Sequence, residues 1–153
     1  MDLILWRHAE AIDVELVGDD MARSLTARGE KQAARMAAWL DRQMPDGAKV
    51  LVSPALRAEQ TATALGRKFK ICPGLAPLAT TEELLELTHW PLGKGCVLVV
   101  GHQPTLGRTI ARLLGLQDSE CVVRKGAVWW LRHREREEAA QTVVVTVQSP
   151  ETL

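Results

Sequence analysis

The residues best suited to chemistry stand where three apolar runs end. Arg7 and His8 follow the first run, Ser53 follows the second, and His102 follows a third that closes on glycine. Arg57 lies one helical turn beyond Ser53. An imidazole can act as nucleophile or general base, and a guanidinium binds phosphate oxygens through paired N–H donors. These residue types, repeated at the ends of apolar runs, indicate phosphoryl chemistry.

The elements that must position these residues alternate between strand and helix. The strands are predicted over residues 3–6, 49–52, 70–72, 96–100, 127–131 and 142–147. Helical spacing predicts a helix from Thr26 to about 43, one capped by Ser53 and running to about 68, one over 80–87 and one over 105–114. Residues 11–23 are expected to form an irregular loop, and the charged run 132–138 a solvated turn.

This alternation predicts the fold class. We expect one domain over residues 1–153, built as a three-layer α/β/α sandwich around a mostly parallel mixed sheet, with an antiparallel pair of strands at the end. Ligands of open α/β sheets bind beyond the carboxyl ends of the strands. His8, Ser53 and His102 should meet there, and the helix that follows Ser53 should add N–H groups that favour an anion.

Composition narrows the choice of partners. Nineteen basic residues balance nineteen acidic ones in 153 residues, which argues against nucleic acid or an anionic membrane as partner. No run of 18 apolar residues occurs, and the N-terminus does not resemble a signal peptide, so a cytoplasmic location is expected. The three cysteines form no C-x-x-C pair, and no nucleotide-binding or metal-ligand motif is present. The prediction is therefore chemistry without a metal or cofactor.

Four segments together resemble a known family. They are LWRHAEA at 5–11, RSLTARG at 23–29, SPALRAEQTA at 53–62 and VGHQP at 100–104. In this order they resemble the histidine phosphatase superfamily, and within it the compact SixA-type phosphohistidine phosphatases. The resemblance covers roughly residues 1–132 and implies the histidine phosphatase (phosphoglycerate mutase-like) fold.

The resemblance also implies roles for individual residues. His8 matches the nucleophile that becomes phosphorylated, and His102 matches the second histidine of the pocket, which would hydrogen-bond the phosphoryl group. Arg7 and Arg57 match the arginines that hold the phosphoryl oxygens. Ser53 is either a helix cap or a further phosphate contact, and Arg23 is either part of the pocket rim or a partner in a loop salt bridge. The predicted phosphate-binding residues are thus Arg7, Arg57, His102, Ser53 and Arg23.

Two departures from the family pattern bear on the substrate. Position 9 is alanine, where the superfamily commonly has glycine, and no clear general acid is present. The candidates for that acid are Glu82, Glu83 and Glu86, and none lies in a convincing motif. A phosphoramidate has a nitrogen leaving group, which needs less help from an acid than an alkoxide does.

The expected activity is therefore that of a metal-independent phosphohistidine phosphatase. It would act through a phospho-His8 intermediate on a protein partner, for instance a phosphotransfer domain, bound at a shallow and open pocket. Two alternatives stay open at this point. One is a phosphomonoesterase acting on a small-molecule or sugar phosphate, and the other is a non-catalytic phosphate-binding module.

Overall fold

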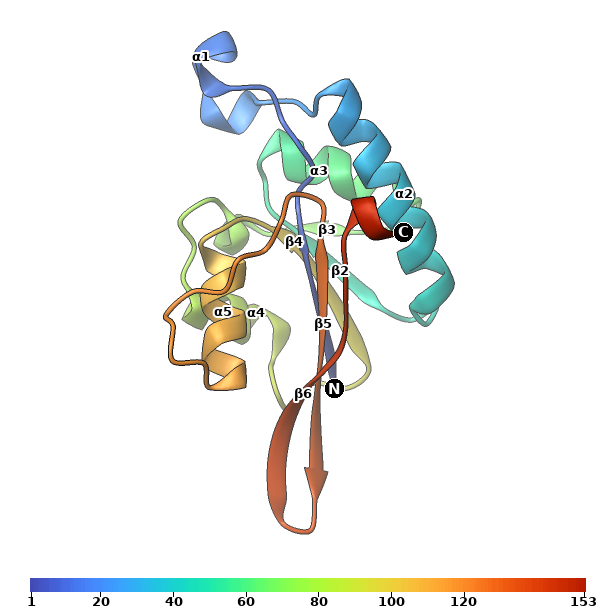
Figure 1. The fold of residues 1–153 in the computed structure, drawn as a ribbon, viewed down its shortest axis with the longest axis vertical. Coiled ribbons are helices and arrows are strands. Elements are labelled where there is room, and N and C mark those ends of the chain that lie inside the picture. The colour runs from blue at the N-terminus through green and yellow to red at the C-terminus, as the bar shows by residue number, and fades with distance from the viewer.

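A six-stranded mixed sheet with helices on both faces forms the body of the protein (Figure 1). The computed structural model describes all residues, 1–153. The strands are β1 (Asp2–Arg7), β2 (Lys49–Val52), β3 (Lys70–Ile71), β4 (Cys96–Gly101), β5 (Val128–Arg136) and β6 (Ala139–Gln148), in the spatial order β3-β2-β4-β1-β5-β6. The first four strands are parallel, while β5 and β6 pair antiparallel. The predicted three-layer sandwich with its closing antiparallel pair is confirmed.

The helices cover the two faces of the sheet in pairs. α2 (Ala27–Gln43) and α3 (Leu56–Thr63) pack on one face, and α4 (Thr81–Thr88) and α5 (Thr105–Leu114) on the other (Figure 1). Side chains alternate along a strand, so Ile4 and Trp6 of β1 enter the α2–α3 core while Leu3 and Leu5 enter the α4–α5 core. The four central residues of β1, Leu3 to Trp6, are buried on both faces and are all apolar. None of the helices is long and apolar enough to cross a bilayer.

The predicted helix ends at α2, α4 and α5 are confirmed by their caps. The Thr26 hydroxyl accepts a hydrogen bond from the N–H of Gly29, and Thr80 forms a reciprocal capping box with Glu83. Gly115 ends α5 in the left-handed conformation that glycine adopts without strain. Each of these capping residues lies directly next to the helix end that it stabilises.

The segment predicted as an irregular loop is partly helical. Residues 11–23 contain the four-residue helix α1 (Val14–Val17) and a 3₁₀ turn, η1 (Asp20–Ala22), and neither contains a buried residue. Gly18 ends α1 in the left-handed conformation, and the Asp19 side chain accepts from the N–H of Met21 to begin η1. Local capping therefore orders this segment without a core of its own.

The helix that follows Ser53 is shorter than predicted. It begins at Leu56 with Ala55 at its N-cap, and it ends at Thr63, whereas the sequence predicted a start at Ser53 and an end near 68. The Ser53 hydroxyl accepts from the N–H of Ala55 in a tight turn that precedes the helix. Gly66 lies past the end of this helix, with a φ of 72° in the left-handed region.

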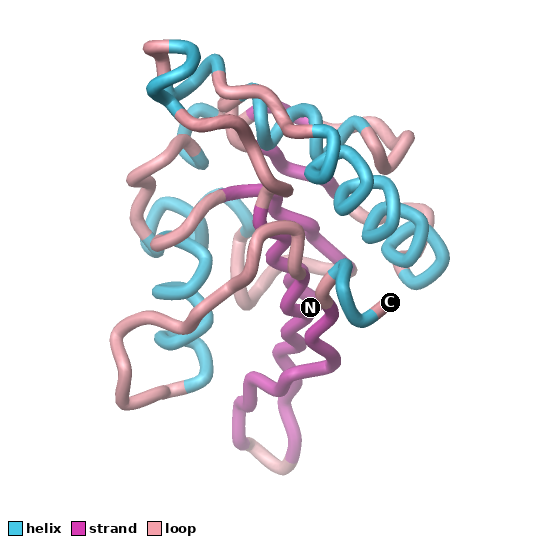
Figure 2. The backbone as a smooth tube through the Cα atoms, turned by 45° about the horizontal axis from the view of Figure 1, so that its top comes forward, coloured by secondary structure: helices cyan, strands magenta, loops and turns pink.

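The closing hairpin also differs from the prediction. The charged run 132–138 is mostly strand, because β5 continues to Arg136 and only Glu137 and Glu138 form the turn, both with positive φ. The end of the hairpin extends beyond the rest of the sheet (Figure 2). Both of its faces there meet water, so charged side chains suit it. The short 3₁₀ helix η3 (Pro150–Thr152) then returns the chain to α2.

Candidate active site

Three neighbouring strands bring the predicted site residues to one edge of the sheet. β2, β4 and β1 are adjacent and parallel, so their carboxyl ends coincide. The N–H of His8 donates to the carbonyl of Gly101 at 3.1 Å, and the N–H of Ser53 donates to that of Val100 at 3.0 Å. Backbone pairing therefore continues one residue past each strand and fixes His8, Ser53 and His102 side by side.

The two histidines face each other in an enclosed position. Their ring centroids are 5.1 Å apart, and only 6% of His8 and 4% of His102 is exposed. Nδ1 of His8 lies 2.8 Å from the carbonyl oxygen of Ala9. Because a carbonyl can only accept, Nδ1 carries the hydrogen, and the lone pair of neutral His8 resides on Nε2. The lone pair on Nε2 of His8 is thus not used by the hydrogen bond to Ala9.

Both rings are held in the neutral form. Burial above all, together with the charges of His102, Arg57 and Arg7, lowers the pKa of His8 from 6.5 to about 3, although a hydrogen bond to the carbonyl of Ala9 raises it. Burial and the charge of Arg57 lower the pKa of His102 to about 4. Near neutral pH, therefore, neither ring is an imidazolium.

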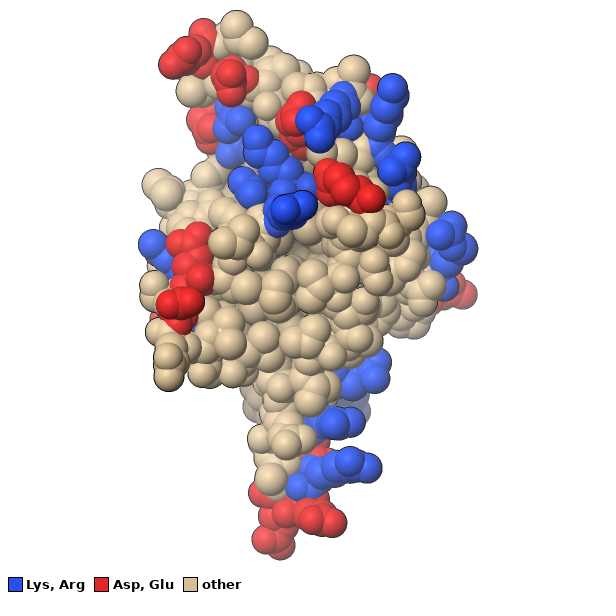
Figure 3. All heavy atoms as spheres, viewed as in Figure 1, with Lys and Arg blue, Asp and Glu red and all other residues tan.

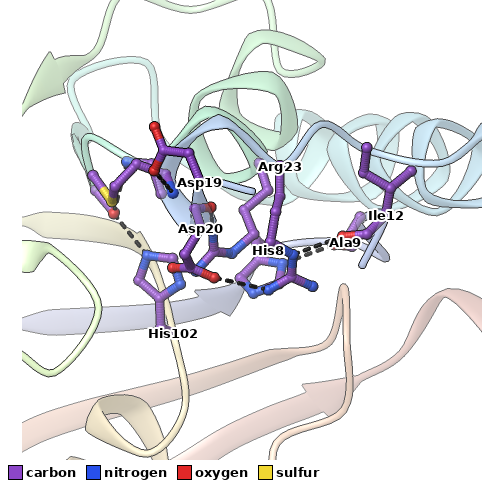
Figure 4. A network of polar contacts seen from close by, with 11 residues as sticks. His8, Ala9, Ile12, Asp19, Asp20, Arg23 and His102 are labelled. Atoms are coloured by element: carbon purple, nitrogen blue, oxygen red, sulfur yellow. Dashed lines mark hydrogen bonds and ion pairs between the residues drawn. The ribbon is translucent and has the colours of Figure 1, made fainter. Parts of the chain in front are cut away.

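Ser53 contacts the second histidine rather than capping a helix. Its Oγ lies 2.7 Å from Nε2 of His102, and Ser53 is fully buried. The other ring nitrogen of His102, Nδ1, is buried with no hydrogen-bond partner. In Figure 4 this side of the ring is turned toward Asp20 and His8. The site consequently has an unsatisfied ring nitrogen next to the predicted nucleophile.

The guanidinium groups of Arg7 and Arg57 are anchored by different parts of the chain. Nη1 of Arg57 donates to the carbonyl of Asp20 at 2.7 Å, and its Nη2 lies 3.1 Å from the Asp20 carboxylate. Nη1 of Arg7 donates to the carbonyl of Val123 at 2.8 Å. The Nε–H groups of both arginines are buried and unpartnered. Because buried donors without partners are costly, the site as it stands is suited to receive an acceptor.

Asp20 is the site residue that the sequence did not indicate. Its carboxylate bridges two arginines. Oδ1 lies 3.1 Å from Nη1 of Arg23 (Figure 4), and Oδ2 lies 3.1 Å from Nη2 of Arg57. Arg23 also donates to the carbonyl of Ile12 at 2.6 Å. Arg23 therefore belongs both to the rim of the site and to a loop salt bridge, the two possibilities that its sequence position left open.

The carboxylate of Asp20 stays ionised. Burial raises its pKa, but hydrogen bonds from Arg23 and Arg57 and their charges outweigh burial and lower the pKa below its usual value. The spacing of three residues between Asp20 and Arg23 was the only signal for this pairing in the sequence. Such spacing has meaning only within a helix, and a loop was predicted here.

The site is less open than the sequence predicted. Arg57, His8 and His102 are each more than nine-tenths buried. The carbonyl and carboxylate of Asp20, in η1, cover the end of the Arg57 guanidinium. Even in a protein of this size, these predicted site residues are therefore covered rather than open to solvent.

The glutamates considered as general acids are engaged elsewhere. Glu82 forms an ion pair with Arg112 of α5, and the Glu83 carboxylate completes the capping box of Thr80. Glu86 is exposed on α4. No group of three His, Cys, Asp or Glu residues is arranged to hold a metal ion. Asp20, in contrast to these glutamates, lies next to the two histidines (Figure 4).

Two imidazoles and a set of arginines at the carboxyl edge of a parallel sheet define a class of phosphate-handling α/β proteins. Comparison with known proteins is consistent with this class. Residues 3–92 match the model of the histidine phosphatase superfamily (branch 1). The chain belongs to the histidine phosphatase superfamily.

Among curated relatives, the chain is 34% identical over 124 residues to the phosphohistidine phosphatase SixA of Escherichia coli, covering 74% of each chain. It is 30% identical over 130 residues to a SixA homologue of Haemophilus influenzae, covering 75% of this chain and 78% of that one. A solved structure of SixA complexed with tungstate superposes with a TM-score of 0.75 at 27% identity, covering 99% of both chains. The protein is therefore a SixA-like histidine phosphatase.

Proposed function

We propose that this protein is a metal-independent phosphatase that removes the phosphoryl group from phosphohistidine on a partner protein, through a phosphorylated His8 intermediate. The observation that carries the proposal is the buried neutral pair of His8 and His102, with the free lone pair of His8 on Nε2. The similarity to phosphohistidine phosphatases supports the choice of substrate. Tungstate, an oxyanion with the shape of phosphate, is present in the similar SixA structure.

In the first step, Nε2 of His8 attacks phosphorus in line with the bond that breaks. The substrate imidazole carries a proton on its other nitrogen, so it leaves as a neutral ring when the electron pair of the P–N bond returns to it. In the second step, water attacks the phosphorus of phospho-His8, and the electron pair of the breaking P–N bond returns to Nε2. Phosphate leaves with the two hydrogens of the attacking water and equilibrates with solvent. Arg7 and Arg57 hold the phosphoryl oxygens and offset their charge in place of a metal ion.

The state of Asp20 favours a phosphoramidate over an ester. An alkoxide leaving group needs a general acid, and an acid must hold its proton near neutral pH. Asp20 does not hold one, because two arginines keep its pKa low. Glu82 and Glu83 lie in other interactions. A substrate whose leaving group needs no proton from the enzyme suits this set of residues.

Asp20 also occupies the donors that a phosphoryl group needs. Both terminal nitrogens of Arg57 bind Asp20. In our proposal the incoming phosphoryl group takes over part of this contact and uses the unpartnered Nε–H groups of Arg7 and Arg57 together with Nδ1 of His102. The carboxylate then acts as a placeholder anion that keeps the arginines in position until substrate arrives.

A panel of substrates tests the proposed function. We expect a phosphorylated histidine-containing phosphotransfer protein to be dephosphorylated, with p-nitrophenyl phosphate and sugar phosphates turned over far more slowly, and EDTA to leave the activity unchanged. His8→Asn should abolish turnover. The matched control is His89→Asn, since His89 lies at the end of α4 in a left-handed conformation that asparagine tolerates.

The panel also separates the alternatives. Turnover of an alkyl phosphate with none of phosphohistidine would identify a phosphomonoesterase instead. Binding of phosphate or tungstate without turnover of any substrate would identify a phosphate-binding module.

A further inference from the structure

A stripe of basic side chains lies on α2 beside the site. Arg28, Lys31 and Arg35 are exposed and spaced by three and four residues, which places them along one side of the helix. Glu30 is exposed on another side, where it lines a separate hollow with Leu25. Glu30 therefore does not neutralise the stripe, but Glu10 of the preceding loop pairs with one of its members, because Oε2 of Glu10 lies 3.9 Å from Nη1 of Arg28.

The stripe borders a hollow of about 190 Å³. It is lined by Arg28, Lys31, Gln32, Arg35, Pro150 and Glu151. Glu151 is the one carboxylate among them and accepts from Nε2 of Gln32 at 3.5 Å, while Nη1 of Arg35 donates to the carbonyl of Pro150 at 3.2 Å. With Glu10 counted as the partner of Arg28, three cations face two anions here, so the hollow keeps a net positive charge.

A second basic segment joins this hollow to the catalytic edge. Arg124 and Lys125 are exposed in the loop before β5. The next residue, Gly126, packs so closely on Pro150 and Gln32 that a Cβ would lie 2.9 Å from Pro150 Cγ. The N–H of Gly126 also donates to the carbonyls of Arg7 and His8, at 3.1 Å each.

The loop is thus attached to the nucleophile on one side and to the lining of the hollow on the other. Figure 3 shows blue side chains gathered in the upper half of this face of the molecule, with fewer red side chains among them.

The other side of the site has the opposite charge. The segment of α1 and η1 exposes Asp13, Glu15 and Asp19, and Figure 3 shows red side chains on the part that protrudes at the top. The whole chain has no net charge, so these two surfaces represent local segregation. An acidic partner is attracted to one side of the site and repelled from the other, which fixes its orientation.

We propose that the basic surface formed by Arg28, Lys31, Arg35, Arg124 and Lys125 docks an acidic surface of the phosphorylated partner protein, next to its phosphohistidine. This inference rests on the proposed function and adds the chemical character of the substrate protein. Charge complementarity next to a reacting group speeds encounter and selects among partners that share the same phosphoryl chemistry.

Two matched phosphohistidine peptides test the proposal, one with aspartate and glutamate around the phosphohistidine and one with serine and glutamine there. We expect kcat/KM of the wild type to be about tenfold higher for the acidic peptide at low ionic strength. The advantage should disappear as salt shortens the Debye length from about 30 Å to about 3 Å. Lys31→Glu combined with Lys125→Glu should abolish the preference and leave the neutral peptide unaffected.

The control carries the same charge change elsewhere. Lys49 begins β2, at the end of the strand opposite to Ser53, and Lys94 lies in the loop before β4. Lys49→Glu combined with Lys94→Glu should retain the preference for the acidic peptide. Loss of the preference in this control as well would mean that overall charge alone is responsible, and would overturn the proposal.

The outcomes separate this inference from the proposed function. If neither peptide nor free phosphohistidine is hydrolysed, the proposed function fails. If both peptides are hydrolysed equally at low ionic strength, the function stands and the docking surface is refuted. Equal hydrolysis together with tight binding of duplex DNA that the Lys31 and Lys125 variant loses would assign the surface to nucleic acid, and would likewise refute docking of an acidic protein.

Discussion

Replacing Asp20 by asparagine should tighten the binding of oxyanions. The carboxylate lies 3.1 Å from Nη2 of Arg57. An oxyanion on the far side of the same guanidinium would be about 6 Å from the carboxylate, because each N–H···O contact spans about 3 Å. Asp20→Asn keeps the size and one acceptor oxygen of the side chain but removes its charge. The repulsion that wild-type Asp20 exerts on the bound anion should therefore be lost.

The size of the effect follows from Coulomb's law. Two unit charges about 6 Å apart repel by about 0.7 kcal/mol in water and about 3 kcal/mol at an effective dielectric constant of about 20. The Asp20 side chain is 47% exposed, so a value between these limits applies. About 1.4 kcal/mol corresponds to a tenfold change in affinity. We expect phosphate and tungstate to bind Asp20→Asn about tenfold more tightly than the wild type.

Isothermal titration calorimetry with tungstate, and inhibition of turnover by phosphate, measure this change. The control is Asp19→Asn, which removes the same charge from the adjacent residue. The Asp19 side chain accepts from Met21 and does not contact Arg57. Unchanged or weaker binding in Asp20→Asn would refute the placeholder role, as would an equal tightening in Asp19→Asn.

Three further predictions concern stability and the second histidine. From pH 7 to pH 5 the free energy of unfolding should fall by about 2 kcal/mol for each of His8 and His102, since the unfolded rings bind protons near pH 6.5 while the folded pKa values are about 3 and about 4. Urea unfolding measures this, and identical pH slopes for wild type and His8→Asn would contradict it. Ser53→Ala removes the hydroxyl that lies 2.7 Å from Nε2 of His102, and it should lower kcat about tenfold and the free energy of unfolding by about 1–3 kcal/mol. An unchanged kcat in steady-state kinetics would show that Ser53 does not position His102 for catalysis. Gly29→Ala should lower the free energy of unfolding by about 1–3 kcal/mol, because the new Cβ would overlap the carbonyl of Glu10. Gly47→Ala is the control, since a Cβ there meets no neighbour and should leave stability unchanged. Equal effects of the two substitutions in thermal unfolding would argue against the close contact.

The sequence predicted best what is decided locally. The strand over 49–52 and the helix over 105–114 have the predicted ends, because the apolar pattern and the cap that define each lie within the element. The residues at the strand ends also met as predicted, since adjacent parallel strands must bring His8 and His102 to one edge.

Contacts between distant residues account for what was missed. The Ser53 hydroxyl resembles a helix cap, yet the helix starts later, and besides the N–H of Ala55 the hydroxyl contacts His102, 49 residues away. Asp20 binds Arg57 across 37 residues, a pairing with no periodic signature in an irregular segment. The charged run 132–138 continues as strand because β6 supplies backbone partners for it, which charge content alone does not predict.

The most direct test of the central claim is to trap the phosphorylated enzyme. Rapid quenching during turnover of a radiolabelled phosphohistidine peptide should give a label on the protein that is labile in acid and stable in base, and peptide mapping should place it on His8. The label should be present in His89→Asn and absent in His8→Ala. A label that survives in His8→Ala, or turnover in that variant at the wild-type rate, would contradict nucleophilic attack by His8.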